Sequence, residues 1–254
     1  MVSLNILGTE GGIGEGSRTS CFLIDDDILI DAGTGLGDLE LDAMVRIDHI
    51  FLSHIHMDHI ACLPLLIDTV VTKRQSPVTV HVPGDDHEKL MRHIFNGVIW
   101  PDFTRIISPE NPAVRIVPLS EQPYDLNGRR IGTLPVNHHG ESVGYWVDGG
   151  DGVLVFTGDT GPCDAFWQGV NALSDVRHLI IECSFPNALE ELALHTGHLC
   201  PALLATELGQ LKGTPDVFAT HMKPMYKVEI LKEISELSTP HDINILEKGQ
   251  IIVF

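Results

Sequence analysis

Short apolar runs bounded by Gly and Asp recur along the chain, and longer amphipathic stretches lie between several of them. Runs of this length that are rich in Val, Ile and Leu are typical of strands. The predicted strands are Leu4–Leu7, Cys21–Ile24, Ile28–Ile30, His49–Leu52, Val78–Val82, Val143–Val147, Gly152–Phe156, His178–Ile181 and Val217–Ala219. Apolar residues at helical spacing predict helices. These helices are Ile60–Thr72, Asp86–Gly97, Pro162–Leu173, Pro201–Leu211 and Lys227–Leu237.

The order of these elements indicates the architecture. Early strands follow one another across short turns such as Asp25–Asp27, whereas later strands alternate with helices. That mixture predicts an α/β fold in which helices cover two sheets, a four-layer α/β/β/α sandwich, and argues against a doubly wound sheet or a closed barrel. Near the end, Ile243–Leu246 and Gln250–Phe254 flank Lys248–Gly249 and predict a closing hairpin.

The chain is long enough, at 254 residues, to bury a full core, and we expect one domain over residues 1–254. It holds no linker-like, low-complexity or repeated segment. The five cysteines are widely spread without a CxxC pair, which indicates reduced thiols. Neither a leader-like segment nor a long apolar span occurs, so we expect a soluble, cytoplasmic protein with no membrane partner.

Acidic residues outnumber basic ones along the chain. The formal net charge is −19, from 16 Lys plus Arg against 35 Asp plus Glu. No run of Lys or Arg forms a patch that could follow a phosphate backbone, so a long nucleic acid is not expected as a partner. An anionic substrate would have to be attracted by the local field of its site.

The segment Ser53–His59 carries the pattern HxHxDH directly after the apolar run Ile50–Leu52. Imidazoles and a carboxylate in this density are typical of sites for divalent ions. Crowded at a strand end, they would repel one another on protonation and would satisfy little without a cation. The candidate ligands are His54, His56, Asp58 and His59.

Two ions need further ligands, and these should follow or precede other strands. Such side chains are present at His138 and His139, at Asp159 and at His221. Each alone is more typical of a turn than of a ligand. In this order behind HxHxDH, they indicate a binuclear metal site.

These motifs resemble the metallo-β-lactamase superfamily over nearly the whole chain, from Gly8 and the turn Asp31–Gly33 to His221. The resemblance implies that His54, His56 and His138 bind one ion, that Asp58, His59 and His221 bind a second, and that Asp159 bridges them. His138 is preferred because it precedes Gly144–Tyr145 by six residues, as the ligand does in the phosphodiesterase branch. The neighbouring His139 remains an alternative.

Two residues outside the ligand set favour attack on phosphorus. Glu182 follows the strand His178–Ile181, and His198 lies shortly before the helix that begins at Pro201. A carboxylate-oriented imidazole can protonate the basic alkoxide that leaves a phosphodiester, and such general acid help contributes about 10²–10⁴-fold. We predict His198 and Glu182 as catalytic residues, although a helix-capping His198 and a surface pair of Glu182 with a Lys are the alternative.

The same two segments, together with Phe95–Phe103, resemble the class II cyclic-nucleotide phosphodiesterases. The most specific likeness is Asn-x-x-Ile-Trp-Pro-Asp-Phe, and Cys200 here replaces a Thr that is common in that family. An aromatic ring can stack on a purine, although core packing is the more common role of a single aromatic. The predicted substrate-binding residues are Asn96, Trp100, Phe103 and Phe185.

The expected reaction is hydrolysis of a 3′,5′-cyclic nucleotide, cyclic AMP or cyclic GMP, to a nucleoside 5′-monophosphate. Two divalent ions about 3.5–4 Å apart would hold a bridging hydroxide as the nucleophile. Asp58 would orient that nucleophile, and His198 would protonate the departing 3′ oxygen. The His-rich ligand set favours zinc, with manganese or iron as competitors. Relatives of this fold often pair, so we expect a homodimer.

Other functions fit part of the pattern. A tRNA 3′-end processing nuclease would share the ligand order and the Glu-His pair, but no basic arm for tRNA is visible between Pro83 and Pro135. A lactonase or thioesterase of this fold would attack carbonyl carbon, and a non-catalytic binding module would not need the full ligand set. The Gly-rich segment Gly8–Gly16 precedes no helix, so we expect a turn near the mouth of the site and not a nucleotide loop.

Overall fold

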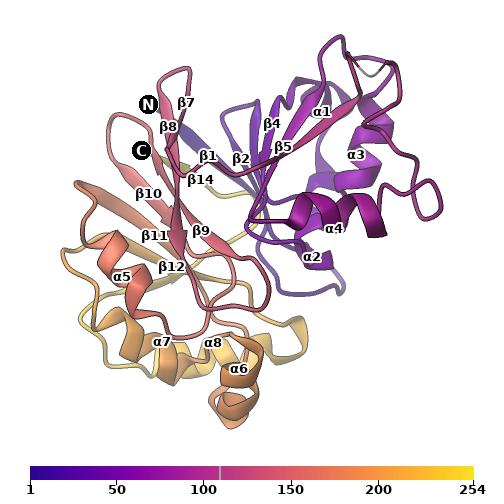
Figure 1. Cartoon of the computed structure of the whole chain (residues 1–254). Coiled ribbons are helices and arrows are strands. Elements are labelled where there is room, and N and C mark those ends of the chain that lie inside the picture. Colours follow the sequence, from indigo (N-terminus) through magenta and orange to yellow (C-terminus); the bar gives the residue numbers. More distant parts are fainter. Residues whose placement is uncertain (109) are drawn as a thin grey trace.

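Two β-sheets lie face to face in the computed structural model, which describes residues 1–108 and 110–254 (Figure 1). Within these residues each sheet has seven strands. The first runs in the order β14 (Ile251–Val253), β1 (Ser3–Gly8), β2 (Cys21–Ile24), β3 (Ile28–Ile30), β4 (His49–Phe51), β5 (Val78–Val82) and β6 (Val114–Pro118). The second runs in the order β13 (Ile243–Ile245), β12 (Asp216–Thr220), β11 (Val176–Glu182), β10 (Val153–Phe156), β9 (Val143–Asp148), β8 (Arg129–Pro135) and β7 (Tyr124–Leu126).

Helices cover the outer surface of each sheet. The first sheet carries α1 (Leu41–Arg46), α2 (Met57–Ile60), α3 (Leu63–Val70) and α4 (Asp86–His93). The second carries α5 (Asp164–Val170), α7 (Pro201–Leu208) and α8 (Lys227–Ser235). Helix α6 (Glu190–Thr196) lies beyond the end of this sheet, where its buried residue Ala193 packs with Phe185 and Cys200. The short 3₁₀ turns are η1 (Thr34–Asp38), η2 (Asn187–Leu189) and η3 (Pro224–Tyr226). None of the helices among the described residues has the length and apolar character needed to cross a membrane.

The central strands are buried on both faces because each sheet lies between its partner sheet and a helix layer. On β2, Phe22 and Ile24 face the second sheet, whereas Cys21 and Leu23 face the helices of the first. On β10, Leu154 faces the first sheet in the same way. Continuous apolar runs are what two-sided burial requires. The predicted four-layer sandwich is confirmed.

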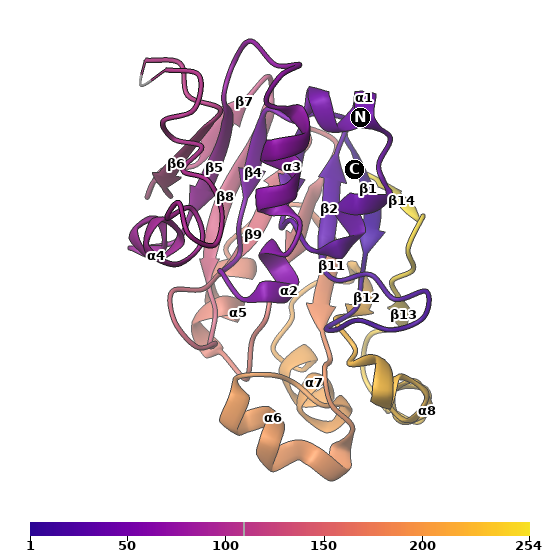
Figure 2. The same cartoon turned by 90° about the vertical axis from the view of Figure 1, so that its right-hand side faces the viewer.

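The direction of the strands brings distant segments to one edge. Strands β3 to β6 are parallel to one another, and so are β10 to β13. The chain therefore leaves β4, β10, β11 and β12 at the carboxyl edges of their sheets. In the view of Figure 2, α2 lies at the lower end of β4 and α6 lies below the second sheet. The ligand-type motifs follow these strands.

The closing hairpin predicted around Lys248–Gly249 is wrong. Strand β13 pairs in parallel with β12 of the second sheet, while β14 pairs antiparallel with β1 of the first. Leu246, between them, is buried in the core between the sheets. The turn therefore carries the chain from one sheet to the other, because each short apolar run completes a different sheet edge.

The other elements differ mainly in their bounds. The predicted helix Ile60–Thr72 corresponds to α3, which begins at Leu63 and ends at Val70, and the separate short helix α2 ends at Ile60, where the predicted range begins. Strands β6, β7 and β8 and helices α1 and α6 were not predicted. Strands β6 and β7 carry exposed polar and charged positions, so their apolar pattern is weak.

Candidate metal centre

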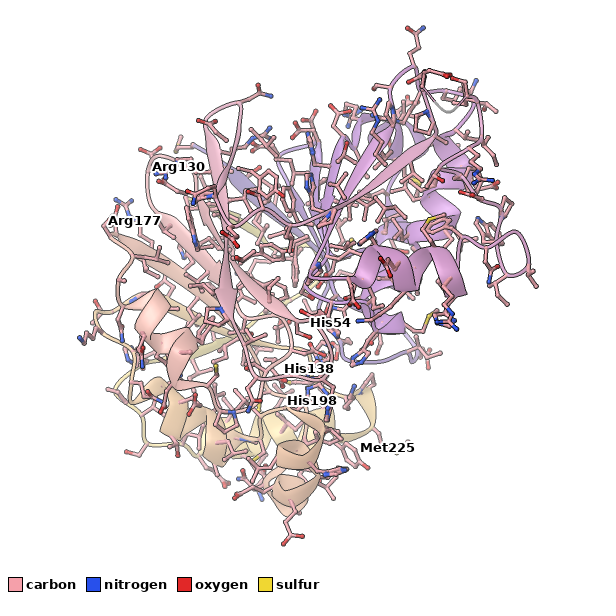
Figure 3. The ribbon with its side chains drawn as sticks, in the orientation of Figure 1. His54, Arg130, His138, Arg177, His198 and Met225 are labelled. Carbon is pink, nitrogen blue, oxygen red and sulfur yellow. The ribbon has the colours of Figure 1, made fainter. Side chains whose placement is uncertain are left out.

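The first group of ligand-type side chains consists of His54, His56, His138 and Asp159, whose ligand atoms lie within 4.8 Å of one another. His56 Nδ1 is 2.9 Å from His54 Nε2 and 3.2 Å from His138 Nε2. Asp159 Oδ2 is 3.7 Å from His54 Nε2 and 3.8 Å from His138 Nε2. Figure 3 shows His54 and His138 close together between the two halves of the sandwich.

The second group consists of Asp58, His59, Asp159 and His221, again with ligand atoms within 4.8 Å of one another. His59 Nε2 and His221 Nε2 are 3.2 Å apart, and His221 Nε2 is 3.4 Å from Asp58 Oδ2. The other oxygen of Asp159, Oδ1, is 3.3 Å from His59 Nε2 and 3.2 Å from His221 Nε2. One carboxylate thus faces both groups.

Tight local backbone geometry aims these side chains inward. His221 leaves β12 with φ at 62°, in the left-handed region that is uncommon for a non-glycine residue. Gly158, just before Asp159, has φ at 61°, a conformation that glycine adopts without steric cost. His59 comes from the single turn of α2, one residue after Asp58.

Hydrogen bonds from outside the two groups fix the orientation of the rings. Asp31, fully buried, accepts from the Ser53 backbone N–H at 2.7 Å, from Ser53 Oγ at 2.9 Å and from His59 Nδ1 at 2.7 Å. His138 Nδ1 donates to the carbonyl of Gly197 at 2.8 Å. Partners of this kind set the tautomer of metal-binding histidines and raise their basicity.

The lone pairs of the ring nitrogens and carboxylate oxygens converge on the centre of the site, as they would around a bound cation. A backbone carbonyl only accepts, so His138 carries its proton on Nδ1 and turns an unprotonated Nε2 toward Asp159. Asp159 Oδ1 is buried and has no hydrogen-bond donor. Both ring nitrogens of His59 face carboxylates, those of Asp31 and Asp159. Only positive charge at the centre satisfies this arrangement, and these residues fit divalent ions.

The pKa directions agree with this geometry. Burial lowers the pKa of His54, His56 and His138, so their imidazoles are neutral and able to coordinate. Burial opposes ionisation of Asp159, but the surrounding histidines outweigh it and hold the pKa of its carboxyl well below the usual range. Asp159 is therefore an anion at neutral pH.

Beside the two groups, Glu182 and His198 form a buried pair. His198 Nδ1 is 2.6 Å from Glu182 Oε1. The same carboxylate accepts from the Thr160 N–H at 3.1 Å and from Ser184 Oγ at 2.8 Å. Burial opposes protonation of His198, but Glu182 outweighs it and raises the pKa of the imidazole. The pair holds a proton next to the cluster.

The ring of His198 lies against both groups. Its centroid is 4.9 Å from that of His138 and 5.8 Å from that of His221 (Figure 3). Ser184 Oγ also lies 3.0 Å from His221 Nδ1, so it connects Glu182 to the second group. An acid on His198 would therefore face a substrate held between the groups.

Of the two neighbouring histidines, the structure turns His138 toward the cluster. His139 instead points away, because its Nε2 lies 2.9 Å from the carbonyl oxygen of His195. This placement agrees with the preference for His138 that the resemblance implied.

Of the four predicted substrate-binding residues, one lies beside the ligand groups and three lie in or near the core of the first sheet. Phe185 lies beside the Glu182–His198 pair, with its ring 5.6 Å from that of His198. Asn96 Oδ1 accepts the backbone N–H groups of its own loop, and Trp100 Nε1 donates to the carbonyl of Pro64. Phe103 is 2% exposed and belongs to the core under the helices of the first sheet. Trp100 and Phe103 thus pack in and around that core, and the role in substrate binding of all four residues stays a prediction.

Sequence patterns did not identify several residues that the structure places at the centre. The sequence places Asp31 in a turn, but it gives no sign that the carboxylate of Asp31 orients His59. Ser184 and Lys223 were not singled out either, although both stand within two residues of Glu182 or His221. Their position beside predicted ligands was the one available signal.

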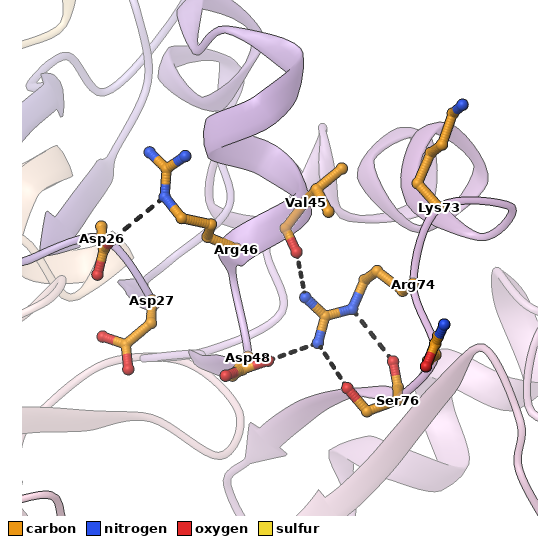
Figure 4. Close-up of a pocket in the computed structure, with 9 residues that line it drawn as sticks. Asp26, Asp27, Val45, Arg46, Asp48, Lys73, Arg74 and Ser76 are labelled. Carbon is orange, nitrogen blue, oxygen red and sulfur yellow. Dashed lines mark hydrogen bonds and ion pairs between the residues drawn. The ribbon is translucent and has the colours of Figure 1, made fainter.

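A separate hollow of about 430 Å³ lies among residues that precede β3 and β4, at the opposite edge of the first sheet (Figure 4). Arg74 there donates to the Val45 carbonyl, the Ser76 carbonyl and Asp48. Arg46 pairs with Asp26 at 3.1 Å. Because Arg74 and Arg46 are already paired within the chain, we assign these two side chains a structural role.

Comparisons with known proteins agree with this architecture. Residues 26–222 match the family described as the Beta-lactamase superfamily domain. A probable 3′,5′-cyclic-nucleotide phosphodiesterase of Yersinia pestis is 26% identical, with 94% of this chain and 84% of that protein covered. A ribonuclease Z of Halorubrum lacusprofundi is 28% identical over 58% of this chain and 48% of its own length. The structure of unliganded yeast PDE1 matches with a TM-score of 0.80 at 19% identity, covering 98% of each chain.

Two helix-covered sheets with ligand-type side chains at their carboxyl edges define the metallo-β-lactamase fold, and the likeness to yeast PDE1 shows that fold. Because the family match covers most of its length, the chain belongs to the Beta-lactamase superfamily. This fold, together with the two groups of His and Asp, implies binding of divalent metal.

Proposed function

We propose that this chain is a metal-dependent phosphodiesterase that hydrolyses 3′,5′-cyclic nucleotides, cyclic AMP first, to nucleoside 5′-monophosphates. The observation that carries the proposal is the buried Glu182–His198 pair beside two groups of ligands that share Asp159. The Yersinia pestis relative, named a probable 3′,5′-cyclic-nucleotide phosphodiesterase, supports this substrate class.

In the proposed site His54, His56 and His138 would hold one divalent ion and Asp58, His59 and His221 a second, and Asp159, which belongs to both groups, would be a ligand to each. When bound, the ions supply positive charge that acidifies water and neutralises the oxygens of a phosphate. The donor set of imidazoles and carboxylates favours zinc, with manganese or iron as competitors. Ligand type alone does not select among these metals.

The residues of the chain supply the proton transfers. The carboxylate of Asp58 reaches the cluster from its open side, since its side chain is 24% exposed, and it orients the attacking water. His198, protonated beside Glu182, gives its proton to the departing 3′ oxygen. Glu182 holds the imidazole in place and stabilises its positive form.

Cyclic AMP hydrolysis by the zinc-loaded protein tests the proposal. We expect 5′-AMP as the product and not 3′-AMP, because the acid protonates the 3′ oxygen. Cyclic GMP assayed in parallel gives the base preference. A protein that holds metal but turns over neither nucleotide would contradict the assignment.

A tRNA 3′-processing nuclease is the second candidate, favoured by the ribonuclease Z relative. That match covers 58% of this chain, and the net charge of −19 disfavours a large polyanion. Cleavage of a precursor tRNA in the same preparations separates the two. Cleavage of the tRNA without turnover of cyclic nucleotide would select the nuclease.

A further inference from the structure

We propose that Lys223 binds an anionic oxygen of the substrate phosphate. The proposal rests on the phosphodiesterase function above and adds a residue to it. Lys223 follows His221 by two positions and begins the turn into η3. Its Nζ lies 4.0 Å from Asp58 Oδ2, at the edge of the second ligand group.

Lys223 is the basic side chain that pairs with the ligand groups. Among the described residues, no other Lys or Arg forms an ion pair with any of the seven ligand-type side chains. The chain as a whole carries a net charge of −19. A substrate anion that approaches Asp58 therefore meets the permanent positive charge of Lys223, in addition to the protonated imidazole of His198.

The ammonium group of Lys223 has N–H donors that its contacts within the protein leave unused. An ammonium carries three N–H donors. Within the described part of the chain, the one hydrogen bond of Lys223 Nζ goes to the carbonyl of Gly11, at 2.8 Å, and Asp58 is too distant for a second. The Lys223 side chain is 28% exposed, so its free donors are open to a ligand.

The bond to Gly11 also positions the ammonium. A Cβ on Gly11 would lie 2.8 Å from His221 Nδ1, so the Gly-rich turn sits directly against the ligand ring. Gly12 and Gly14 lie against Pro224 in the same way. The turn thus holds Lys223 Nζ beside the second ligand group and limits its freedom before substrate arrives. Less conformational entropy is then lost on binding.

Lys227 provides a matched control on the same stretch of chain. It lies four residues further on and pairs with Glu10, not with the ligand groups. Its side chain is 39% exposed, similar to that of Lys223. Removing either charge changes the net charge of the protein by the same amount.

The test compares Lys223→Met with Lys227→Met in the zinc-loaded protein, by calorimetric binding of 5′-AMP and by kinetics on cyclic AMP and on bis(p-nitrophenyl) phosphate. A charged hydrogen bond of this kind predicts about tenfold to hundredfold weaker 5′-AMP binding for Lys223→Met, with unchanged metal content. Lys227→Met should bind as the parent does. Binding by Lys223→Met within twofold of the parent would overturn the proposal.

Lys223→Gln separates phosphate binding from a role in holding the turn, because glutamine keeps a donor for Gly11 but has no charge. If Lys223 only ties Gly11, this variant restores 5′-AMP binding, and the proposal fails. If the charge binds phosphate, Lys223→Gln binds 5′-AMP as weakly as Lys223→Met does. Failure of the wider function looks different, since the parent protein itself would then turn over neither cyclic AMP nor bis(p-nitrophenyl) phosphate.

Discussion

Asp31 shows how a single residue outside the ligand set organises the centre. Its carboxylate satisfies the backbone and hydroxyl of Ser53 and one ring nitrogen of His59, and it does so without exposure to water. Such a residue acts through the ligand that it orients. The aspartate could be seen in the sequence, but the partner on another segment could not, because contacts between distant segments leave no local pattern.

Replacing Asp31 by Asn should weaken metal binding. An asparagine has one accepting oxygen, so it cannot accept both from the Ser53 N–H and from His59 Nδ1, as the two oxygens of Asp31 do. Loss of such a partner typically costs about tenfold to hundredfold in metal affinity. Metal content after dialysis against a chelator measures the effect, with the exposed Asp42→Asn as control. Unchanged retention of metal in Asp31→Asn would show that His59 needs no orienting carboxylate.

His198→Ala and Glu182→Gln should lower kcat for cyclic AMP by about 10²–10⁴-fold, the usual contribution of a general acid. The loss should be much smaller for bis(p-nitrophenyl) phosphate, because nitrophenolate leaves without a proton. Steady-state kinetics at constant metal content give both numbers. An equal loss on the two substrates would assign the pair a structural role.

At the scale of elements, the carboxyl ends of β4, β10, β11 and β12 supply most of the site. Apolar runs followed by His, Asp or Glu made these strand ends predictable. The aromatic segment around Trp100 was less informative, because the same residue types serve in a core and in a base-binding pocket. The closing hairpin failed for a related reason, since strand pairing in different sheets depends on long-range packing that a turn sequence does not encode.

The Gly-rich turn should tolerate no side chain where it meets the ligand ring. In Gly11→Ala the Cβ would lie 2.6 Å from the His221 carbonyl oxygen, and something must shift. We expect loss of activity and of bound metal, because His221 would move with the turn. Gly37→Ala is the control, since its Cβ meets no atom within 4 Å. Full metal content and activity in Gly11→Ala would show that the turn is free to move.

At the scale of the whole molecule, both sheets must stay packed for the two ligand groups to meet. His81 on β5 lies in this interface, with its ring stacked on Phe51 at 4.2 Å between centroids. Its Nε2 is 3.0 Å from His49 Nδ1. Burial, followed by the nearby His49, lowers the pKa of His81 to about 4. The homodimer expected from the sequence stays a prediction.

Acidic pH should therefore lower the free energy of unfolding of the protein. The folded pKa of His81 lies below its unfolded value, so protonation favours unfolding, and stability is lost as pH falls from about 6.5 toward 4, by at most about 1.4 kcal/mol per pH unit. Urea unfolding of metal-free protein at several pH values should show a shallower pH slope for His81→Gln. The exposed His93→Gln should match the parent. Parallel slopes for parent and His81→Gln would contradict the assignment.

Anomalous diffraction from active, metal-loaded crystals soaked with 5′-AMP tests the central claim most directly. The account predicts two peaks on either side of Asp159, one among His54, His56 and His138 and the other among Asp58, His59 and His221, with the phosphate between them. A single peak, or none, in crystals of protein that hydrolyses cyclic AMP would contradict it.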